Sequence, residues 1–276
     1  MRVGGDPSTV VLDPQNGDIY VPNSLSDFLS VISGATNTVV ANVTVVTGVE
    51  GGVFDPTNGD LYWTSNTMGL VLIIAGGTNS LVGNITLNYG PSYCPWVDDN
   101  LPPNIPCTQS LDSPLDPVFG PASGDIYVAN GGGDSVSVIS GATNSLVTNI
   151  NFSSSPGNPV FDPANGDIYI PVGGGLSAIS SVTNAVVANI TLGSGPDQPV
   201  FNPVNGDIYV HTTPSNVGSG STPSNSTLFI ISGATNSVVW KVVVCYATSA
   251  GPVVSSKGDV YVSCGDAIWV IYSTTT

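Results

Sequence analysis

Positive charge is nearly absent from this chain. Only three of its 276 residues are Lys or Arg, against 19 Asp and Glu, and the formal net charge is −16. A surface of that sign repels a polyanion, so we exclude nucleic acid as a partner. Charged residues make up only 8% of the chain, and the surface therefore consists mainly of Ser, Thr, Asn and Gln.

Histidine and long apolar runs are also scarce. The single histidine, His211, has no Ser, Cys or Asp spaced around it as a catalytic triad, so we expect no enzyme active site there. No run of eighteen apolar residues is present, which excludes a membrane-spanning helix. No basic, apolar leader follows Met1, so we expect the start of a mature or engineered chain, or else a cytosolic protein.

Glycine and proline, by contrast, are abundant, at 33 and 22 residues. Gly and Pro interrupt regular elements, and the many β-branched residues suit a pleated sheet. We therefore predict an all-β chain of short strands and tight turns, with almost no helix.

One motif occurs six times along the chain. It reads NGDIY, NGDLY, SGDIY, NGDIY, NGDIY and KGDVY, at residues 16–20, 58–62, 123–127, 165–169, 205–209 and 257–261. The intervals are 42, 65, 42, 40 and 52 residues, and a period near forty with several strands per repeat is typical of β-propeller blades. Within one repeat, residues 158–192, four strands alternate with turns. We predict a single β-propeller domain over residues 1–276, with six four-stranded blades and insertions at about 89–115 and 212–227.

The motif residues have structural explanations. In Asp-Pro-x-Asn-Gly-Asp, proline fixes φ, Asn and Gly accept positive φ, and aspartate caps its own turn. The tyrosines recur with apolar neighbours, so we expect them to pack between blades. They are Tyr20, Tyr62, Tyr127, Tyr169, Tyr209 and Tyr261.

The phrases DPANGDIYI, VSVISGATNSLV and ANITLGSGP resemble the YVTN-type propeller repeats of archaeal and bacterial surface proteins. The likeness covers nearly the whole chain. It implies a propeller fold in a surface-layer or other extracellular protein, with no shared catalytic motif. Well-described members of that family have seven blades, whereas this chain supplies six repeats.

The last repeat is incomplete. It contains a first strand at 253–256, a second at 259–264 and a third at 267–272, and no outer strand follows. Alignment of the repeats places Met1–Val3 at the end of an outer strand, so the N-terminus supplies only a stub. We expect an open strand edge that a neighbouring subunit or a missing part of the chain completes. The alternative is a trimmed but tolerated last blade.

Both insertions follow strand ends on the same predicted face, which makes that face a candidate contact surface. The alternative is that the insertions are surface loops without a function. The residues that would form the contact surface are Tyr89, Tyr93, Trp96, Asp98 and Asp99.

Four cysteines predict two disulfides, Cys94 with Cys107 and Cys245 with Cys264, because no CxxC motif is present to form a zinc site. Five sequons suggest glycosylation, and three occupy equivalent outer-strand positions; alternatively they are the polar face of half-exposed strands. The sequon asparagines are Asn42, Asn84, Asn151, Asn189 and Asn225.

The chain also offers candidate ligands for calcium, which six-bladed propellers of the lactonase type hold at the tunnel mouth. The residues that precede the first strands offer oxygen ligands, but no general base or carboxylate pair stands out. We favour a solvated polar mouth over a calcium site, so we expect neither a metal nor a cofactor. They are Glu50, Asp116, Asn158, Asp197 and Gln198.

Together these features favour a non-enzymatic, extracellular structural protein, a subunit of a surface layer or filament that associates with itself or with another surface protein through the incomplete blade. One alternative is a monomeric propeller that binds a glycan or peptide on the insertion face. Another is a calcium-dependent, lactonase-like hydrolase.

Overall fold

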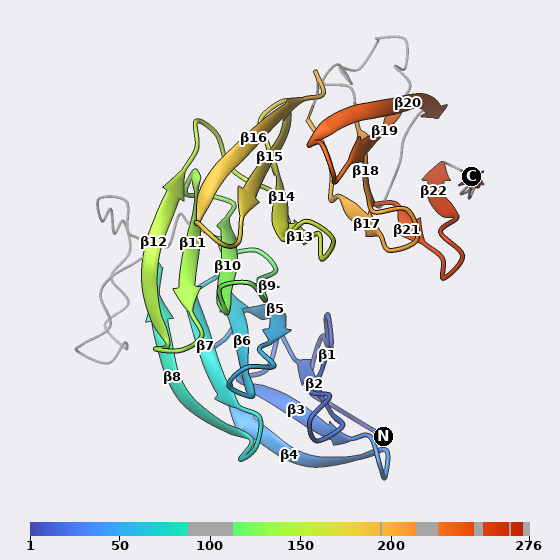
Figure 1. The fold of residues 1–276 in the computed structure, drawn as a ribbon. Helices are drawn as coiled ribbons and strands as arrows, with labels where there is room; N and C mark the ends of the chain where they lie inside the picture. Colours follow the sequence, from blue (N-terminus) through green and yellow to red (C-terminus); the bar gives the residue numbers. More distant parts are fainter. Residues whose placement is uncertain (88–112, 194, 214–225, 246–250, 265, 273–276) are drawn as a thin grey trace, which may run out of the picture. The chain divides into compact units, whose positions relative to one another are not determined.

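The structure is a computed structural model that describes residues 1–87, 113–193, 195–213, 226–245, 251–264 and 266–272. Within these ranges all regular structure is β-strand, arranged in six antiparallel sheets (Figure 1). The predicted absence of helix is therefore confirmed for this part of the chain. No helix in it is long and apolar enough to cross a membrane.

The chain divides into two compact units. The first comprises Met1–Phe119 and Gly124–Asn151. Its three sheets each contain four strands in the orders β1-β2-β3-β4, β5-β6-β7-β8 and β12-β11-β10-β9. The strands are β1 (Val11–Leu12), β2 (Asp18–Pro22), β3 (Phe28–Ser33), β4 (Thr38–Thr44), β5 (Val49–Phe54), β6 (Asp60–Ser65), β7 (Leu70–Ala75), β8 (Ser80–Thr86), β9 (Val118–Gly120), β10 (Asp125–Asn130), β11 (Ser135–Ser140) and β12 (Ser145–Asn151).

The second unit comprises Gly120–Ser123 and Phe152–Thr276. Two of its sheets have four strands, and the last, β21-β22-β23, has three in the described residues. The strands are β13 (Val160–Phe161), β14 (Asp167–Val172), β15 (Gly175–Ser180), β16 (Ala185–Thr191), β17 (Val200–Asn202), β18 (Asp207–Thr212), β19 (Ser226–Ser232), β20 (Ser237–Cys245), β21 (Val253–Val254), β22 (Val260–Cys264) and β23 (Ala267–Ile271).

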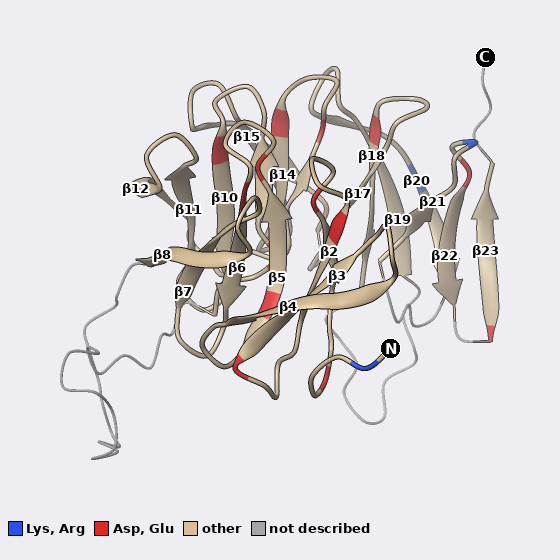
Figure 2. Cartoon of the chain, turned by 90° about the horizontal axis from the view of Figure 1, so that it is seen from below, with Lys and Arg blue, Asp and Glu red and all other residues tan. Residues whose placement is uncertain are grey.

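The repeated motif forms the turn between the first and second strands of each sheet. In the first sheet, Asp13 Oδ1 accepts a hydrogen bond from the Gln15 amide at 2.8 Å, and Asn16 Oδ1 accepts one from the Asp18 amide at 2.7 Å. Gly17, between Asn16 and Asp18, has a φ of 78°, a conformation that glycine adopts without steric cost. The aspartates are thus turn residues, as predicted, and most carboxylates lie at turns and strand ends (Figure 2).

Apolar side chains fill the space between consecutive sheets of a unit. Tyr20, Leu29 and Val31 of the first sheet pack against Leu61 and Trp63 of the second. Equivalent clusters lie between the second and third sheets and between the sheets of the second unit. The second-strand tyrosines are buried in these clusters, which confirms their predicted place between blades for Tyr20, Tyr62, Tyr169 and Tyr209.

A hydrogen bond joins each of three such tyrosines to the next sheet. The Tyr hydroxyl donates to the carboxamide oxygen of an asparagine in the turn between the third and fourth strands of that sheet. We call this contact the tyrosine–asparagine link. The linked pairs are Tyr20 with Asn79, Tyr62 with Asn144, and Tyr169 with Asn236. Burial raises the pKa of each linked tyrosine to about 12, so the hydroxyl keeps its proton.

The solvent side of the outer strands mixes polar residues with valine, such as Val40 at 53% exposed. Asn42 and Thr44 are exposed, whereas Val43 between them is buried, as strand alternation predicts. The pairing of each outer strand with its neighbour contains a register shift, for example between Val31 and Ile32 opposite β4. Shifts of this kind twist an outer strand and hinder further pairing.

Candidate interaction site on the last sheet

The last sheet ends on an unprotected strand. β22 pairs with β21 on one side and with β23 on the other, and no described strand pairs with the far side of β23 (Figure 2). In the five other sheets the third strand is covered by a fourth. The prediction that this repeat lacks its outer strand is therefore confirmed within the described residues.

The sequence of β23 is that of an inner strand. Its residues, AIWVI, form a continuous apolar run, like LVLII in β7, where Val71, Leu72 and Ile73 are buried. In β23 the same kind of residue lies in solvent: Ile268 is 68% and Trp269 is 45% exposed. A strand composed for burial on both sides is thus left at the edge of its sheet.

One feature of the other outermost strands is absent here. All five outer strands opposite a third strand have a register shift in their pairing. The pairing of β22 with β23 runs from Val260 with Ile271 to Cys264 with Ala267 without one. Like β4, β8, β12 and β16, β23 contains no charge and no proline, so the register shift is the feature that distinguishes those strands from it. A flat apolar edge of this kind accepts another strand readily.

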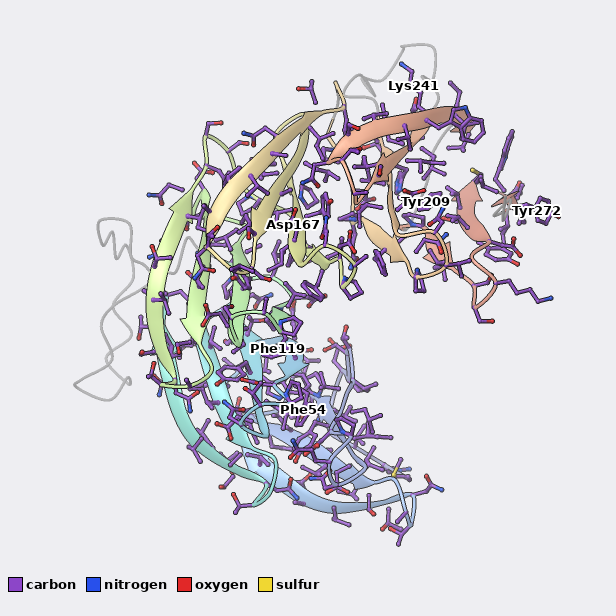
Figure 3. All side chains as sticks on the ribbon, viewed as in Figure 1. Phe54, Phe119, Asp167, Tyr209, Lys241 and Tyr272 are labelled. Atoms are coloured by element: carbon purple, nitrogen blue, oxygen red, sulfur yellow. The ribbon has the colours of Figure 1, made fainter. Side chains whose placement is uncertain are left out.

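The two faces of the last sheet differ. One face, with Val254, Val260 and Val262, packs against Tyr209 and Leu228 of the preceding sheet. Cross-strand pairing places Val253, Tyr261 and Val270 in a row on the opposite face. That face is exposed, with Val253 at 64% and Tyr272, just beyond β23, at 73%. Figure 3 shows Tyr272 on the far side of the last sheet from Tyr209.

The N-terminal residues lie next to the first sheet. Met1–Val3 form no strand, and because they and the last sheet belong to different units, their role as an outer-strand stub stays a prediction. The residues that follow bond to a loop of the first sheet. The Gly5 amide donates to Ser26 Oγ at 2.9 Å, and the Ser24 amide donates to the Asp6 carbonyl at 3.0 Å.

His211 has a partner that the sequence did not reveal. Its side chain is fully buried, and its Nε2 lies 3.3 Å from Oδ2 of Asp197, which is 48% exposed. The two meet because Pro196 bridges to Thr212 and the Asp197 amide donates to the His211 carbonyl. Burial lowers the pKa of His211, and the Asp197 carboxylate partly opposes that shift. Neither ring nitrogen makes a hydrogen bond within the described residues.

The proposed calcium ligands lie in different units. Glu50 and Asp116 belong to the first unit, and Asn158, Asp197 and Gln198 belong to the second. Burial, and then the nearby Glu50 carboxylate, raise the pKa of Asp116. Among the described residues no group of three or more His, Cys, Asp or Glu side chains could hold a metal ion.

Other predicted sites are only partly described. The insertion residues Tyr89, Tyr93, Trp96, Asp98 and Asp99, together with Cys94, Cys107 and Asn225, lie outside the described residues. The sequon residues Asn42, Asn84, Asn151 and Asn189 are exposed on outer strands. Cys245 ends β20, and Cys264 is buried at the end of β22. No described cysteine is free, and the disulfide pairing itself stays a prediction.

Comparison with known proteins supports the fold. No family model matches the chain, and no curated protein matches it in sequence. Among solved structures, Kuenenia stuttgartiensis hydrazine synthase is similar over 95% of this chain and 75% of its own, with a TM-score of 0.71 and 16% identity. Dihydro-heme d1 dehydrogenase NirN is similar over 99% of this chain, with a TM-score of 0.67 and 13% identity. This chain spans only 55% of the length of NirN. Both are β-propeller proteins, and the likeness shows a propeller-type fold alone.

Proposed function

We propose that this protein is a non-enzymatic, extracellular building block, a subunit of a surface layer or filament that assembles by strand addition at the edge of β23. The observation that carries the proposal is the missing outer strand. β23 has the composition of an inner strand, yet its far side has no described partner. Pairing with a strand from a neighbouring molecule would bond the free backbone groups of β23 and cover Ile268 and Trp269.

The exposed apolar surface supports an interaction role for the last sheet over a last blade that simply tolerates three strands. Ile268, Trp269 and Tyr272 are large apolar side chains within five residues of one another, and each is exposed by 45% or more. The pairing register places Ile268 and Trp269 on opposite faces of the sheet, so apolar side chains are exposed on both sides of this edge. Soluble monomers seldom present such a flat, apolar strand edge, because it invites uncontrolled association. A dedicated partner strand would remove that hazard.

The extracellular location rests on the resemblance to YVTN-type surface propellers, together with the four cysteines and five sequons. Four of the sequon asparagines are exposed on outer strands, where an attached glycan would not disturb the packing between sheets. The proposed protein is thus an extracellular propeller with six blades, the last of which a second molecule completes.

The test is the association state of the whole chain over a series of concentrations, measured by mass photometry and negative-stain microscopy. A peptide with the sequence of residues 185–192, AVVANITL, serves as a soluble outer strand, because the native outer strand of the fourth sheet has this sequence. We expect concentration-dependent oligomers or filaments that the peptide disperses and that a scrambled peptide leaves intact. A protein that stays monomeric at micromolar concentration and does not bind the peptide would contradict the proposal.

A further inference from the structure

Each tyrosine–asparagine link is one part of a larger contact between consecutive sheets. In the second sheet, Asn58 Nδ2 donates to the Tyr62 hydroxyl at 2.9 Å and to the Gly141 carbonyl of the third sheet at 2.8 Å. The Tyr62 hydroxyl donates to Asn144 Oδ1. Asn144 Nδ2 in turn donates to Asp60 Oδ2 at 3.2 Å. The Asn, Asp and Tyr of one motif thus bind a Gly-Ala-Thr-Asn turn of the next sheet.

The same contact recurs in the second unit, between its first two sheets. Asn165 Nδ2 donates to the Gly233 carbonyl at 2.6 Å. The Tyr169 hydroxyl donates to Asn236 Oδ1, and Asn236 Nδ2 donates to Asp167 Oδ2 at 3.0 Å. Both ends of the asparagine side chain are therefore bound, its oxygen by a hydroxyl donor and its nitrogen by a carboxylate acceptor. This pair of partners suits a carboxamide, because a carboxylate has no donor to offer the aspartate.

The fifth sheet has the same three groups without the turn. Asn205, Asp207 and Tyr209 occupy the corresponding positions of its motif, and Asn205 Nδ2 donates to the Tyr209 hydroxyl at 2.9 Å. No other hydrogen bond to Asn205 Nδ2, the Tyr209 hydroxyl or the Asp207 carboxylate forms within the described residues. The next sheet of the same unit is the last one, in which no described turn connects a third strand to a fourth.

These groups lie where an added outer strand would begin. Tyr209 packs with Val260 and Val262 of the last sheet (Figure 3). It is 4% exposed, whereas the linked tyrosines of the other sheets are fully buried. In the third sheet, Asn144 directly precedes the outer strand β12. A segment that pairs with β23 as an outer strand therefore brings the residue before that strand to Tyr209.

We propose that Asn205, Asp207 and Tyr209 bind the asparagine side chain of a Gly-x-x-Asn turn in the segment that completes the last sheet. This inference rests on the proposed strand addition and states what the incoming segment contains. Its asparagine adopts the left-handed conformation seen at Asn144 and Asn236, with φ of 52° and 51°. The site recognises a side chain, whereas pairing along β23 recognises only the backbone.

The test measures how two capped, labelled peptides bind the full chain below its association concentration, by fluorescence anisotropy. Residues 141–151, GATNSLVTNIN, contain the turn and the outer strand, and residues 145–151 contain the strand alone. We expect the longer peptide to bind at least about five-fold more tightly, the effect of one net hydrogen bond. Asn144→Asp in the peptide should abolish that gain, because its carboxylate faces Asp207. An aspartate added after residue 151 is the charge control and should not.

A protein variant tests the same contact from the other side. Tyr209→Phe removes only the hydroxyl, so it should weaken binding of the longer peptide about five-fold and leave the shorter one unaffected. Asn144→Ala in the peptide should cost less affinity against this variant than against the wild-type protein, since both changes remove the same bond. Tyr261→Phe is the matched control, because its side chain lies on the opposite face of the last sheet.

Each contrary outcome is specific. Equal affinities of the two peptides, or a Tyr209→Phe effect of the same size on both, would overturn the asparagine site and leave strand addition standing. Failure of both peptides to bind would overturn strand addition at β23 itself. In the free protein, Tyr209→Phe should destabilise less than Tyr62→Phe, because its hydroxyl makes one described bond rather than two. An equal loss would show that the chain supplies its own acceptor, which also overturns the proposal.

Discussion

Removing a single hydroxyl from an internal link should destabilise the protein measurably. Tyr62 is fully buried, and its hydroxyl accepts a hydrogen bond from Asn58 Nδ2 at 2.9 Å and donates one to Asn144 Oδ1. Tyr62→Phe removes both bonds. At about 1 kcal/mol of net stability for each, the free energy of unfolding should fall by about 2 kcal/mol. For a chain of this size that corresponds to a drop of roughly 4–8 °C in melting temperature.

Urea unfolding followed by tryptophan fluorescence would measure the change, and an unaltered m-value would show that the same surface unfolds. Tyr261→Phe, in a motif whose tyrosine is exposed, is the control. Below the association concentration it should change stability by no more than about 0.5 kcal/mol. The reasoning is refuted if Tyr62→Phe leaves the free energy of unfolding unchanged, or if both variants lower it by the same amount.

Three further predictions concern steric fit and pH. A Cβ at Gly141 would collide with Asp55 Oδ2 and lie 2.6 Å from the Gly124 carbonyl oxygen, whereas one at Gly77 would meet nothing within 4 Å. We therefore expect Gly141→Ala to lower the free energy of unfolding by roughly 2–3 kcal/mol and Gly77→Ala by less than about 0.5 kcal/mol, as measured by thermal melts. The linked tyrosines have a pKa of about 12, above the unfolded value of 10.0. Their contribution to stability is therefore complete below pH 10 and is lost as the pH rises toward 12. Denaturation at several alkaline pH values would detect this loss. Burial lowers the pKa of His211, so the neutral imidazole stabilises the folded state above pH 6.5, and this contribution is lost as the pH falls below that value. His211→Gln should therefore make the free energy of unfolding depend less steeply on pH below 6.5. An unchanged slope would contradict this prediction.

The sequence predicted the strands well because turn chemistry marks their limits. The Asn-Gly-Asp turn sets the start of the second strand, and β14 (Asp167–Val172) accordingly begins at the aspartate of its motif. The same logic located the incomplete repeat, since β23 follows the last motif and no outer-strand pattern comes after it. Local conformational preferences were sufficient for these features.

Contacts between distant residues were not predictable in the same way. Tyr62 and Asn144 lie 82 residues apart, and each was visible as part of a repeated phrase, but only the packing of consecutive sheets brings the phrases together. The signal was the joint recurrence of the tyrosine motif and a turn that ends in Thr-Asn, and the last repeat lacks that turn. Asp197 and His211 were missed for a similar reason, since a single bridge between Pro196 and Thr212 aligns them.

The central claim is that the far side of β23 pairs with another strand. Hydrogen–deuterium exchange of the peptide covering residues 266–272, measured above and below the association concentration, tests it directly. The account predicts that amides of this strand exchange fast in the dilute protein and become protected on assembly, while peptides from the covered third strand β15 do not change. Equal and rapid exchange of β23 in both states, with assembly otherwise intact, would contradict it.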